Sequence, residues 1–378
     1  MISPELFFNT LRDNGVNYFT GVPDSLLKHF CSYVDSNVDD QSHTIAANEG
    51  AALSIAIGYH FASNNMPLVY MQNSGLGNII NPLTSLADPA IYSVPMLLMI
   101  GWRGEPGVKD EPQHVKQGRV TLELLDTLEI PYTIIDANVS DIKQRIKIAI
   151  ESAQKQGCAH ALVIRKSTFS EYRKPNESTT NFGWQREDAI KMIVDATNDT
   201  DIIVSTTGMA SRELFEYRAK NGQKHHQDFL TVGGMGHASQ IALGIAQQKK
   251  NNRVICIDGD GAALMHLGSL AITGVSKLNN FKHIILNNGA HDSVGGQPTV
   301  AFEINLSDIA KACGYQVTNI CDSHKCFSDK FKNFLDSKGP SIIEVRVDKG
   351  NRKDLGRPTS SPLENKQNFM NFLSNLPA

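Results

Sequence analysis

Two polar turns in this chain of 378 residues each follow an apolar run and carry residues that could bind a cation. Gly259-Asp260-Gly261 follows the apolar run 254–257, and Asn288 follows the apolar run 283–286. Short β-branched runs that end in turn residues are typical of buried parallel strands. Because the carboxyl ends of parallel strands meet at one edge of a sheet, where open α/β sheets bind their ligands, we expect Asp260 and Asn288 to lie close together.

This pair of oxygen donors indicates a magnesium diphosphate site. A carboxylate and a neutral amide oxygen suit an octahedral Mg2+ that keeps some of its positions for phosphate oxygens. The glycines on either side of Asp260 let backbone N–H groups approach phosphate without a Cβ in between. An isolated Gly-Asp-Gly is usually only a turn. Its pairing with a second polar turn after the next strand makes the pattern far more specific.

The Gly-Asp-Gly turn followed by Asn287-Asn288 resembles the cofactor motif of the thiamin-diphosphate-dependent decarboxylases and synthases. The resemblance implies that Asp260, Asn288 and the backbone carbonyl of Ala290 hold Mg2+. It also implies that Glu49 hydrogen-bonds the pyrimidine ring of the cofactor and that Met235 forces the cofactor into its bent conformation. Further cofactor contacts are expected from residues of the turns at strand ends, namely Asn73, Thr207, Gly208, Gly233, Gly259, Gly261 and Ala262.

Glu49 opens a stretch, 49–59, that is rich in alanine and glycine and poor in charge. Glutamate in a first helical turn is common, because the helix dipole favours it. A helix of this composition can pack on every side, so we expect Glu49 to be buried or to lie at an interface. The glycine-rich loop that begins at Asn73 could also cradle phosphate, although this pattern alone is weak.

The whole chain alternates apolar runs with amphipathic stretches, which predicts an α/β fold. We expect two domains, each an open parallel sheet with helices on both faces: a pyrimidine-binding domain at 1–166 and a diphosphate-binding domain at 185–350. The polar segment 167–184 is expected to be a linker, and 351–378 a C-terminal tail. The predicted strands are 18–21, 43–46, 67–71, 92–101, 130–135 and 159–164 in the first half, and 201–205, 228–232, 254–257, 283–286 and 341–347 in the second.

Composition argues against several classes of protein. A formal net charge of −3 gives no reason to expect nucleic acid or an anionic membrane as a partner. The sequence has no apolar run of membrane-spanning length and no signal-peptide core at its start. Its six cysteines are scattered without a CxxC pair, which favours a reducing cytoplasm and argues against a zinc site.

The first half of the chain also contributes candidates for substrate binding. Asp24 and Ser25 follow a predicted strand, and the Ser25 hydroxyl could donate to an anion. The segment 105–119 shows no periodicity and is expected to be a long loop, which in a compact domain is usually functional or mobile. The cationic candidates are Arg103, Lys109, His114, Lys116 and, in the tail, Arg357, each of which could equally be a solvated surface residue.

The short linker resembles the compact two-domain branch of the family. Within this branch, the segments 21–25, 207–209, 211–215, 287–297 and 356–359 resemble members that act on a 2-oxo acid with a second anionic group. The resemblance implies conversion of 3-phosphonopyruvate to phosphonoacetaldehyde and CO2 in phosphonate (2-aminoethylphosphonate) biosynthesis, with the cofactor as electron sink. Sulfopyruvate or another 2-oxo acid is the alternative substrate. The sulfonate enzymes often consist of two chains, so a single fused chain favours the phosphonate. His291 and Asp292 are candidates for returning a proton after CO2 leaves.

The resemblance further implies self-association, because in this family the site forms between the first domain of one chain and the second domain of another. A homodimer is therefore the smallest expected assembly. One rival reading is a thiamin enzyme of carboligation or oxidative acyl transfer, which would need a flavin or lipoyl partner. Another is a non-catalytic nucleotide-binding protein, although the sequence contains no GxxxxGK[ST] motif.

Overall fold

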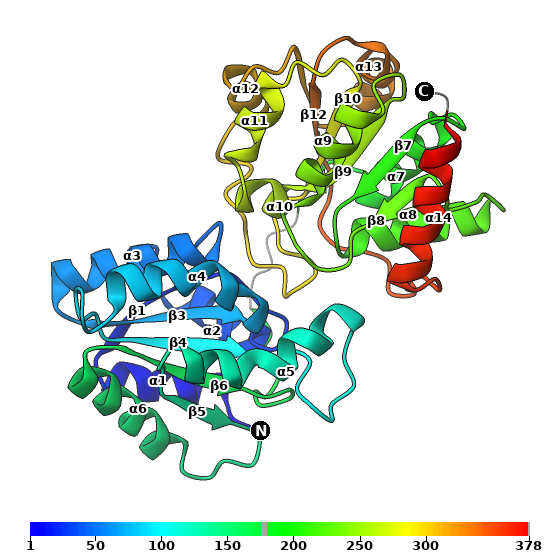
Figure 1. Cartoon of the computed structure of the whole chain (residues 1–378). Coiled ribbons are helices and arrows are strands. Elements are labelled where there is room, and N and C mark those ends of the chain that lie inside the picture. Colours follow the sequence, from blue (N-terminus) through cyan, green and yellow to red (C-terminus); the bar gives the residue numbers. More distant parts are fainter. Residues whose placement is uncertain (175–179, 377–378) are drawn as a thin grey trace. The chain divides into compact units, whose positions relative to one another are not determined.

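The structure is a computed structural model that describes residues 1–174 and 180–376. The chain divides into two compact units, Met1–Glu177 and Ser178–Ala378. Each unit is an α/β layer structure in which helices cover both faces of a sheet (Figure 1). Each is described separately below. No helix of the described residues has the length and apolar character needed to cross a membrane.

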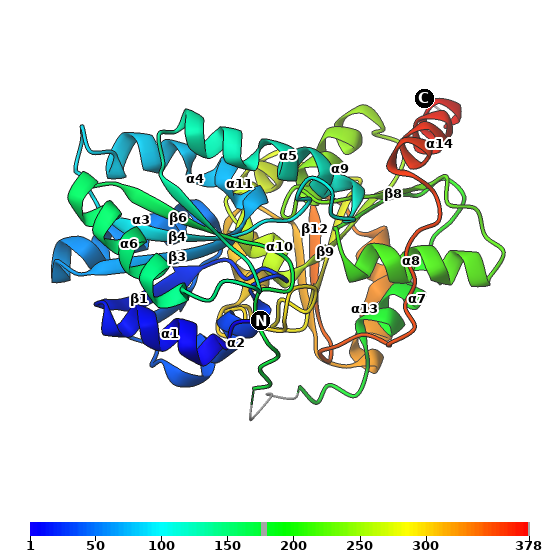
Figure 2. The same ribbon diagram turned by 90° about the horizontal axis from the view of Figure 1, so that it is seen from below.

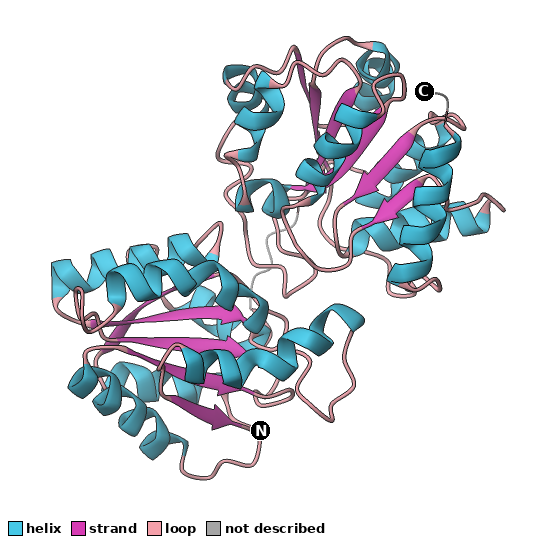
Figure 3. Ribbon diagram, viewed as in Figure 1, coloured by secondary structure: helices cyan, strands magenta, loops and turns pink. Residues whose placement is uncertain are grey.

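The first unit contains a six-stranded parallel sheet in the order β2-β1-β3-β4-β6-β5 (Figure 3). Its strands are β1 (Val16–Gly21), β2 (His43–Ile45), β3 (Met66–Gln72), β4 (Met96–Gly101), β5 (Tyr132–Ile135) and β6 (Ala159–Ile164). One face is covered by α1 (Pro4–Asp13), α2 (Lys28–Asn37) and α6 (Ile142–Gln156). The other is covered by α3 (Glu49–Ser63), α4 (Leu76–Pro82) and α5 (Pro112–Thr127).

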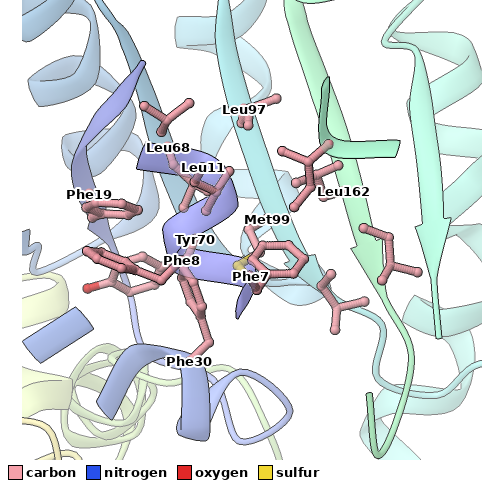
Figure 4. Close-up of a cluster of buried hydrophobic side chains, with 14 of the residues drawn as sticks. Phe7, Phe8, Leu11, Phe19, Phe30, Leu68, Tyr70, Leu97, Met99 and Leu162 are labelled. Atoms are coloured by element: carbon pink, nitrogen blue, oxygen red, sulfur yellow. The ribbon is translucent and has the colours of Figure 1, made fainter. Parts of the chain in front are cut away.

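Aromatic and aliphatic side chains fill the space between this sheet and its helices. Phe7 of α1 and Phe30 of α2 meet edge to face, and Leu68 and Met99 of the central strands belong to the same core (Figure 4). A second core lies on the opposite face of the sheet. Because both faces are buried, the central strands are continuously apolar, which is why the sequence predicts them well.

The second unit repeats this arrangement. Its strands are β7 (Ile202–Ser205), β8 (Asp228–Leu230), β9 (Val254–Gly259), β10 (Phe281–Asn287), β11 (Val317–Cys321) and β12 (Ser341–Arg346). They form a parallel sheet in the order β11-β12-β10-β9-β7-β8, which is the strand order of the first unit read in the opposite direction. The predicted fold class, two open parallel sheets with helices on both faces, is confirmed.

Helices again cover both faces of the second sheet. The first face packs against α7 (Arg186–Asp195), α8 (Met209–Lys220) and α13 (His324–Asp336) (Figure 2). The second packs against α9 (Ala238–Gln248), α10 (Asp260–Met265), α11 (Ser269–Val275), α12 (Leu306–Ala312) and α14 (Pro362–Asn375). Each unit therefore has two hydrophobic cores, one on each side of its sheet.

The prediction of a long loop at 105–119 is wrong for its second half, because α5 begins at Pro112. Pro112 suits the first position of a helix, where no N–H donor is needed. The buried face of the first three turns carries His114, Gly118 and Thr121. None of these is a large apolar residue, so the hydrophobic period that would reveal a helix is missing from the sequence.

The edge strand β11 was not predicted from the sequence. Its residues alternate weakly in polarity, and only Cys321 is fully covered. An edge strand of this kind has one exposed side and depends on pairing with β12, which the sequence does not reveal.

The structure assigns parts of the predicted linker and tail to the two units. Phe169 packs against Phe7 in the first unit, and Trp184 belongs to a core of the second. The middle of the predicted linker, 175–179, lies outside the described residues, as do 377–378 of the predicted tail. Within the tail, α14 buries Phe369 and Phe372 against the second unit. The domain limits at 166 and 185 stay a prediction.

Candidate functional site

A cavity of about 100 Å³ opens at the carboxyl edge of the second sheet. It lies among the ends of β7, β9 and β10, and β7 and β9 flank the point where the strand order reverses, the usual ligand position in open α/β sheets. The structure brings most predicted residues of this unit to its lining. These are Thr207, Met235, Gly259, Asp260, Gly261, Ala262, Asn288, Ala290, His291 and Asp292.

Asp260 is the first residue of α10, and its side chain is almost completely buried. Thr299 donates a hydrogen bond of 2.5 Å to its carboxylate, and no ion pair within the described residues neutralises it. Burial raises the pKa of Asp260 to about 6, and the nearby charge of Asp292 acts in the same direction. A buried carboxylate that faces a cavity in this way is stabilised by a bound cation.

Asn288 lies directly after β10 and is also buried. Its Nδ2 donates to Oδ2 of Asp292 at 2.6 Å, and its Oδ1 accepts from the N–H of Ala290 at 3.1 Å. Together with Asp260 and the carbonyl of Ala290, Asn288 gives the cavity three oxygen donors of the kind that Mg2+ prefers. The donor set therefore fits the predicted cation.

A buried ion pair that the sequence did not reveal supports this turn. Arg186 donates to both carboxylate oxygens of Glu213, at 2.8 and 2.9 Å, and also to Asp292 at 3.3 Å. Burial raises the pKa of Glu213, while the charge of Arg186 opposes this effect. Arg186 and Glu213 lie on α7 and α8, and no local pattern in the sequence indicates that they meet.

The glycines of the site allow close packing of the turns. A Cβ on Gly261 would lie 2.9 Å from the ring of His291, so this ring packs directly on the Gly-Asp-Gly turn. Burial lowers the pKa of His291 to about 4, which keeps the ring neutral near pH 7. Gly208 has φ of +96°, a conformation that other residues rarely adopt. The backbone N–H of Gly233 donates to Thr207 Oγ1 at 3.0 Å and joins two of the turns.

In the first unit, Glu49 begins α3 and is buried, as the sequence predicts. Asn78 of α4 donates to its Oε2 at 2.7 Å. A Cβ on Gly75 would lie 2.5 Å from Oε1 of Glu49, so the glycine makes the space that this carboxyl group occupies. Asn48 caps the helix by accepting from the N–H of Ala51 at 2.8 Å.

Asn73, a predicted cofactor residue, uses its amide inside the first unit. Its Nδ2 donates to the carbonyl of Arg103 at 2.8 Å and to Thr121 at 2.9 Å, and its Oδ1 accepts from the N–H of Arg103 at 3.2 Å. The side chain is completely buried. These contacts connect the ends of β3 and β4 to α5 and give Asn73 a structural role.

Two predicted substrate residues, Ser25 and Arg103, line a second cavity, of about 190 Å³, in the first unit. Arg103 donates to Asp110 through two nitrogens, at 2.8 and 2.6 Å, and to Ser25 at 2.7 Å. Asp110 also contacts Nδ1 of His114 at 3.0 Å. Lys166, which was not predicted, lines the same cavity. The cavity therefore combines hydroxyl, guanidinium and ammonium donors with the carboxylates of Glu105 and Asp110.

Asp24 precedes Ser25, is not among the residues that line this cavity, and is fully buried. It accepts from Gln72 at 2.7 Å and from the N–H of Leu26 at 2.8 Å. Burial raises the pKa of Asp24, although these hydrogen bonds oppose the shift. Its contacts hold the turn that carries Ser25.

Four predicted cations are not among the lining residues of either cavity, although one of them, His114, contacts Asp110. Lys109 and Lys116 are exposed on the first unit. Arg357 lines a separate cavity of about 1100 Å³ in the second unit, with Phe215 and Phe372. Their proposed role in substrate binding stays a prediction.

Comparison with known proteins identifies the family. The family described as thiamine pyrophosphate enzyme, N-terminal TPP binding domain, matches residues 3–128, and the corresponding C-terminal TPP binding domain matches residues 206–345. The chain is also 32% identical to the phosphonopyruvate decarboxylase of Streptomyces viridochromogenes, over 96% of this chain and 93% of the relative. The chain belongs to the thiamine pyrophosphate enzymes. The predicted family is thereby confirmed.

The expectation that this thiamine pyrophosphate enzyme is a decarboxylase, a carboxy-lyase, is also confirmed. The sulfopyruvate decarboxylase of Methanosarcina acetivorans is 27% identical over 99% of this chain and 98% of its own length. The beta subunit of sulfopyruvate decarboxylase from Methanocaldococcus jannaschii is 37% identical over 45% of this chain and 87% of the subunit. Since the Methanosarcina relative matches as one full-length chain, a fused chain does not by itself favour the phosphonate enzyme.

Proposed function

We propose that this enzyme converts 3-phosphonopyruvate to phosphonoacetaldehyde and CO2 with thiamin diphosphate and Mg2+. The observation that carries the cofactor part is the convergence of Asp260, Asn288 and Ala290 on one cavity. Similarity to a phosphonopyruvate decarboxylase along nearly the whole chain supports the substrate part. Sulfopyruvate is the second candidate, because full-length similarity to a sulfopyruvate decarboxylase also exists, at 27% identity.

In this proposal the second unit binds the charged end of the cofactor. The oxygens of Asp260, Asn288 and Ala290 would hold Mg2+, and backbone N–H groups of the turns at Thr207 and Gly261 would bind the diphosphate. Thiamin diphosphate, when bound, supplies the electron sink for the charge left by CO2, which no side chain can supply. The protein chain itself positions the cofactor and the substrate and stabilises their charges.

Glu49 holds and transfers a proton at its carboxyl group. Asn78 donates to Oε2 and Oε1 lies in the space made by Gly75, so the carboxyl group that would hydrogen-bond the pyrimidine ring is held in place. Burial excludes water from this exchange. His291, which lines the cavity of the second unit, stays the candidate for returning a proton after CO2 leaves.

The second anionic group of the substrate fits the cavity of Ser25, Arg103 and Lys166. Two hydrogen bonds to Asp110 largely balance the charge of Arg103. Lys166 is exposed and forms no ion pair among the described residues, so its ammonium group is the cation that remains for a phosphonate. Tetrahedral phosphonate and sulfonate both accept from such donors, and the phosphonate dianion benefits more from an additional positive charge.

The direct test is CO2 release from phosphonopyruvate, sulfopyruvate and pyruvate, each with and without thiamin diphosphate and Mg2+. We expect release from phosphonopyruvate to exceed the other two and to require both additions. A preference for sulfopyruvate would keep the cofactor and change the substrate. Release without added thiamin diphosphate, from protein shown to be free of it, would overturn the cofactor assignment.

We further propose that the enzyme assembles as a homodimer or a larger oligomer. Large apolar side chains of the first unit are exposed, including Phe61 at 59%, Ile91 at 53% and Tyr92 at 60%. The rings of Phe61 and Tyr92 are in edge-to-face contact, so they form one surface. Light scattering on the purified protein tests this, and a monomer at micromolar concentration would contradict it.

Two further predictions concern the setting of the reaction. The described cysteines are all free thiols, and a cytoplasmic location stays a prediction from their scattered positions. A role in phosphonate biosynthesis follows only if phosphonopyruvate is the substrate. The CO2 measurement above therefore also tests this role.

A further inference from the structure

The side-chain amide of Asn288 could present either its oxygen or its nitrogen to the cavity. Only the oxygen can bind a cation, so the orientation of the amide decides whether Asn288 is a ligand or a repulsive group. Two partners of opposite kind set this orientation. The carboxylate of Asp292 can only accept, so it must face Nδ2, and the N–H of Ala290 can only donate, so it must face Oδ1.

Asp292 is itself held by a converging set of donors. Its Oδ2 accepts from Asn288 Nδ2 at 2.6 Å, from the N–H of Gly350 at 2.9 Å and from Arg186 at 3.3 Å. All three donors contact the same oxygen atom. The arrangement leaves little rotational freedom to this carboxylate and hence to the amide that it orients.

Arg186, the third donor to Asp292, is itself held in place by Glu213. Arg186 makes two parallel hydrogen bonds to Glu213, and the side chains of Arg186 and Asp292 are only 8% and 10% exposed. Bidentate pairs between guanidinium and carboxylate groups combine energy with defined geometry. In a site so shielded from water, these charged hydrogen bonds are stronger than on a surface.

We propose that Asp292 is a positioning residue that turns Oδ1 of Asn288 toward the bound cation, and that Arg186, anchored by Glu213, keeps Asp292 in place. The inference rests on the proposed magnesium site and goes beyond it. It replaces the sequence-based expectation that Asp292 relays a proton. Partners behind a metal ligand fix its orientation, and their loss costs about 10- to 100-fold in metal affinity or activity.

The two roles of Asp292 predict different behaviour for Asp292→Asn and Asp292→Ala. An asparagine can place its amide oxygen where Oδ2 now lies and accept from the same three donors, whereas an alanine accepts from none. A positioning role therefore predicts that Asp292→Asn retains much of the function. A proton-relay role predicts that both variants are equally impaired, because an amide does not exchange a proton.

The test measures Mn2+ binding in the presence of thiamin diphosphate, from the electron paramagnetic resonance signal of the free ion, and thus does not depend on turnover. We expect Asp292→Ala to weaken Mn2+ binding about 10- to 100-fold, and Asp292→Asn to weaken it less than about 10-fold. Steady-state kinetics at saturating metal should return kcat of Asp292→Asn to near the wild-type value.

Asp201→Asn is the matched control. Asp201 precedes β7 at the other end of the sheet and also pairs with an arginine, Arg253, at 3.0 and 2.6 Å, while accepting one backbone N–H at 2.9 Å. Its replacement should lower thermal stability without changing Mn2+ affinity. This control separates loss of a buried ion pair from loss of metal orientation.

The outcomes distinguish failure of this inference from failure of the proposed function. Wild-type protein that binds no Mn2+ with thiamin diphosphate would overturn both. Wild-type binding together with unchanged binding in Asp292→Ala would overturn the positioning role alone. If Asp292→Ala does not fold, Asp292→Asn alone still tests the positioning role. A loss of kcat in Asp292→Asn at saturating Mn2+, without weaker Mn2+ binding, would overturn that role.

Discussion

The two units have the same strand order, yet they use equivalent strand ends differently. Asn73 and Arg103 follow β3 and β4 in the first unit, and Asp260 and Asn288 follow the equivalent β9 and β10 in the second. In the first unit the two residues are hydrogen-bonded to each other. In the second they line one cavity.

The difference shows that the fold supplies a position and not a function. The carboxyl edge of both sheets is a place where ligands can bind. In the first unit, contacts among Asn73, Arg103, Thr121 and Asp110 use the polar groups internally. In the second unit, glycine turns and a carboxylate without a cationic partner among the described residues leave oxygens for a ligand. The predictions below test this contrast, from the largest expected effect to the smallest.

Glu49→Gln tests the proposed cofactor role of the buried carboxyl group that begins α3 in the first unit. Glutamine can still accept from Asn78, so the fold should be retained, but it cannot exchange a proton. Loss of such a group typically costs about 10²- to 10⁴-fold in rate, which we expect in kcat. Turnover near the wild-type level, with unchanged melting temperature, would contradict the role of Glu49.

Asp260→Ala and Asn73→Ala compare equivalent strand ends directly. Removal of Asp260 should weaken Mg2+-dependent cofactor binding by about 100-fold or more, since even loss of an outer partner costs about 10- to 100-fold. Removal of Asn73 should instead lower the free energy of unfolding by about 1–3 kcal/mol, because it leaves buried groups of Arg103 and Thr121 without their partner. Calorimetric titration measures cofactor binding, and urea unfolding measures stability. Weaker cofactor binding in Asn73→Ala, with lower stability alone in Asp260→Ala, would contradict the difference between the two units.

His160 of β6 tests whether acid destabilises the first unit. Burial lowers its pKa from 6.5 to about 4, so the folded state binds the proton later than the unfolded state as pH falls. Stability is therefore complete above pH 6.5 and is lost between pH 6.5 and 4, by on the order of 3 kcal/mol. Urea unfolding across this range should show a flatter pH dependence for His160→Gln than for wild type. Parallel curves would contradict the assignment.

Lys166→Met tests the anionic subsite of the first unit. Loss of one charged donor should raise KM for phosphonopyruvate about 10-fold, consistent with about 1.5 kcal/mol for a hydrogen bond to a charged group. KM for pyruvate, which lacks the second anion, should change less. Lys109→Met is the control, because Lys109 is exposed and does not line this cavity. Equal effects of both variants would indicate only a general field of positive charge.

The sequence reveals much of the candidate site because its features are local. Asp260 and Asn288 stand at the ends of apolar runs, and a parallel sheet places such ends side by side. Glu49 was expected to be buried because its helix is nearly free of charge, and the structure buries it. In contrast, α5 was missed at its start because its buried face carries His114, Gly118 and Thr121 in place of apolar residues.

What the sequence by itself determined is the pair of α/β units and the cofactor motif, since hydrophobic runs, glycine turns and strand-end polar residues act over a few positions. The tertiary structure alone decided which polar residues are bonded inward and which face a cavity. Asn73 and Asn288 look alike in the sequence, yet the partners of Asn73 lie just after β4 and on α5, and Asn288 contacts Asp292, which Arg186 holds from α7. Arg103, Thr121 and Arg186 are distant along the chain from the residues that they contact, so only folding brings them together.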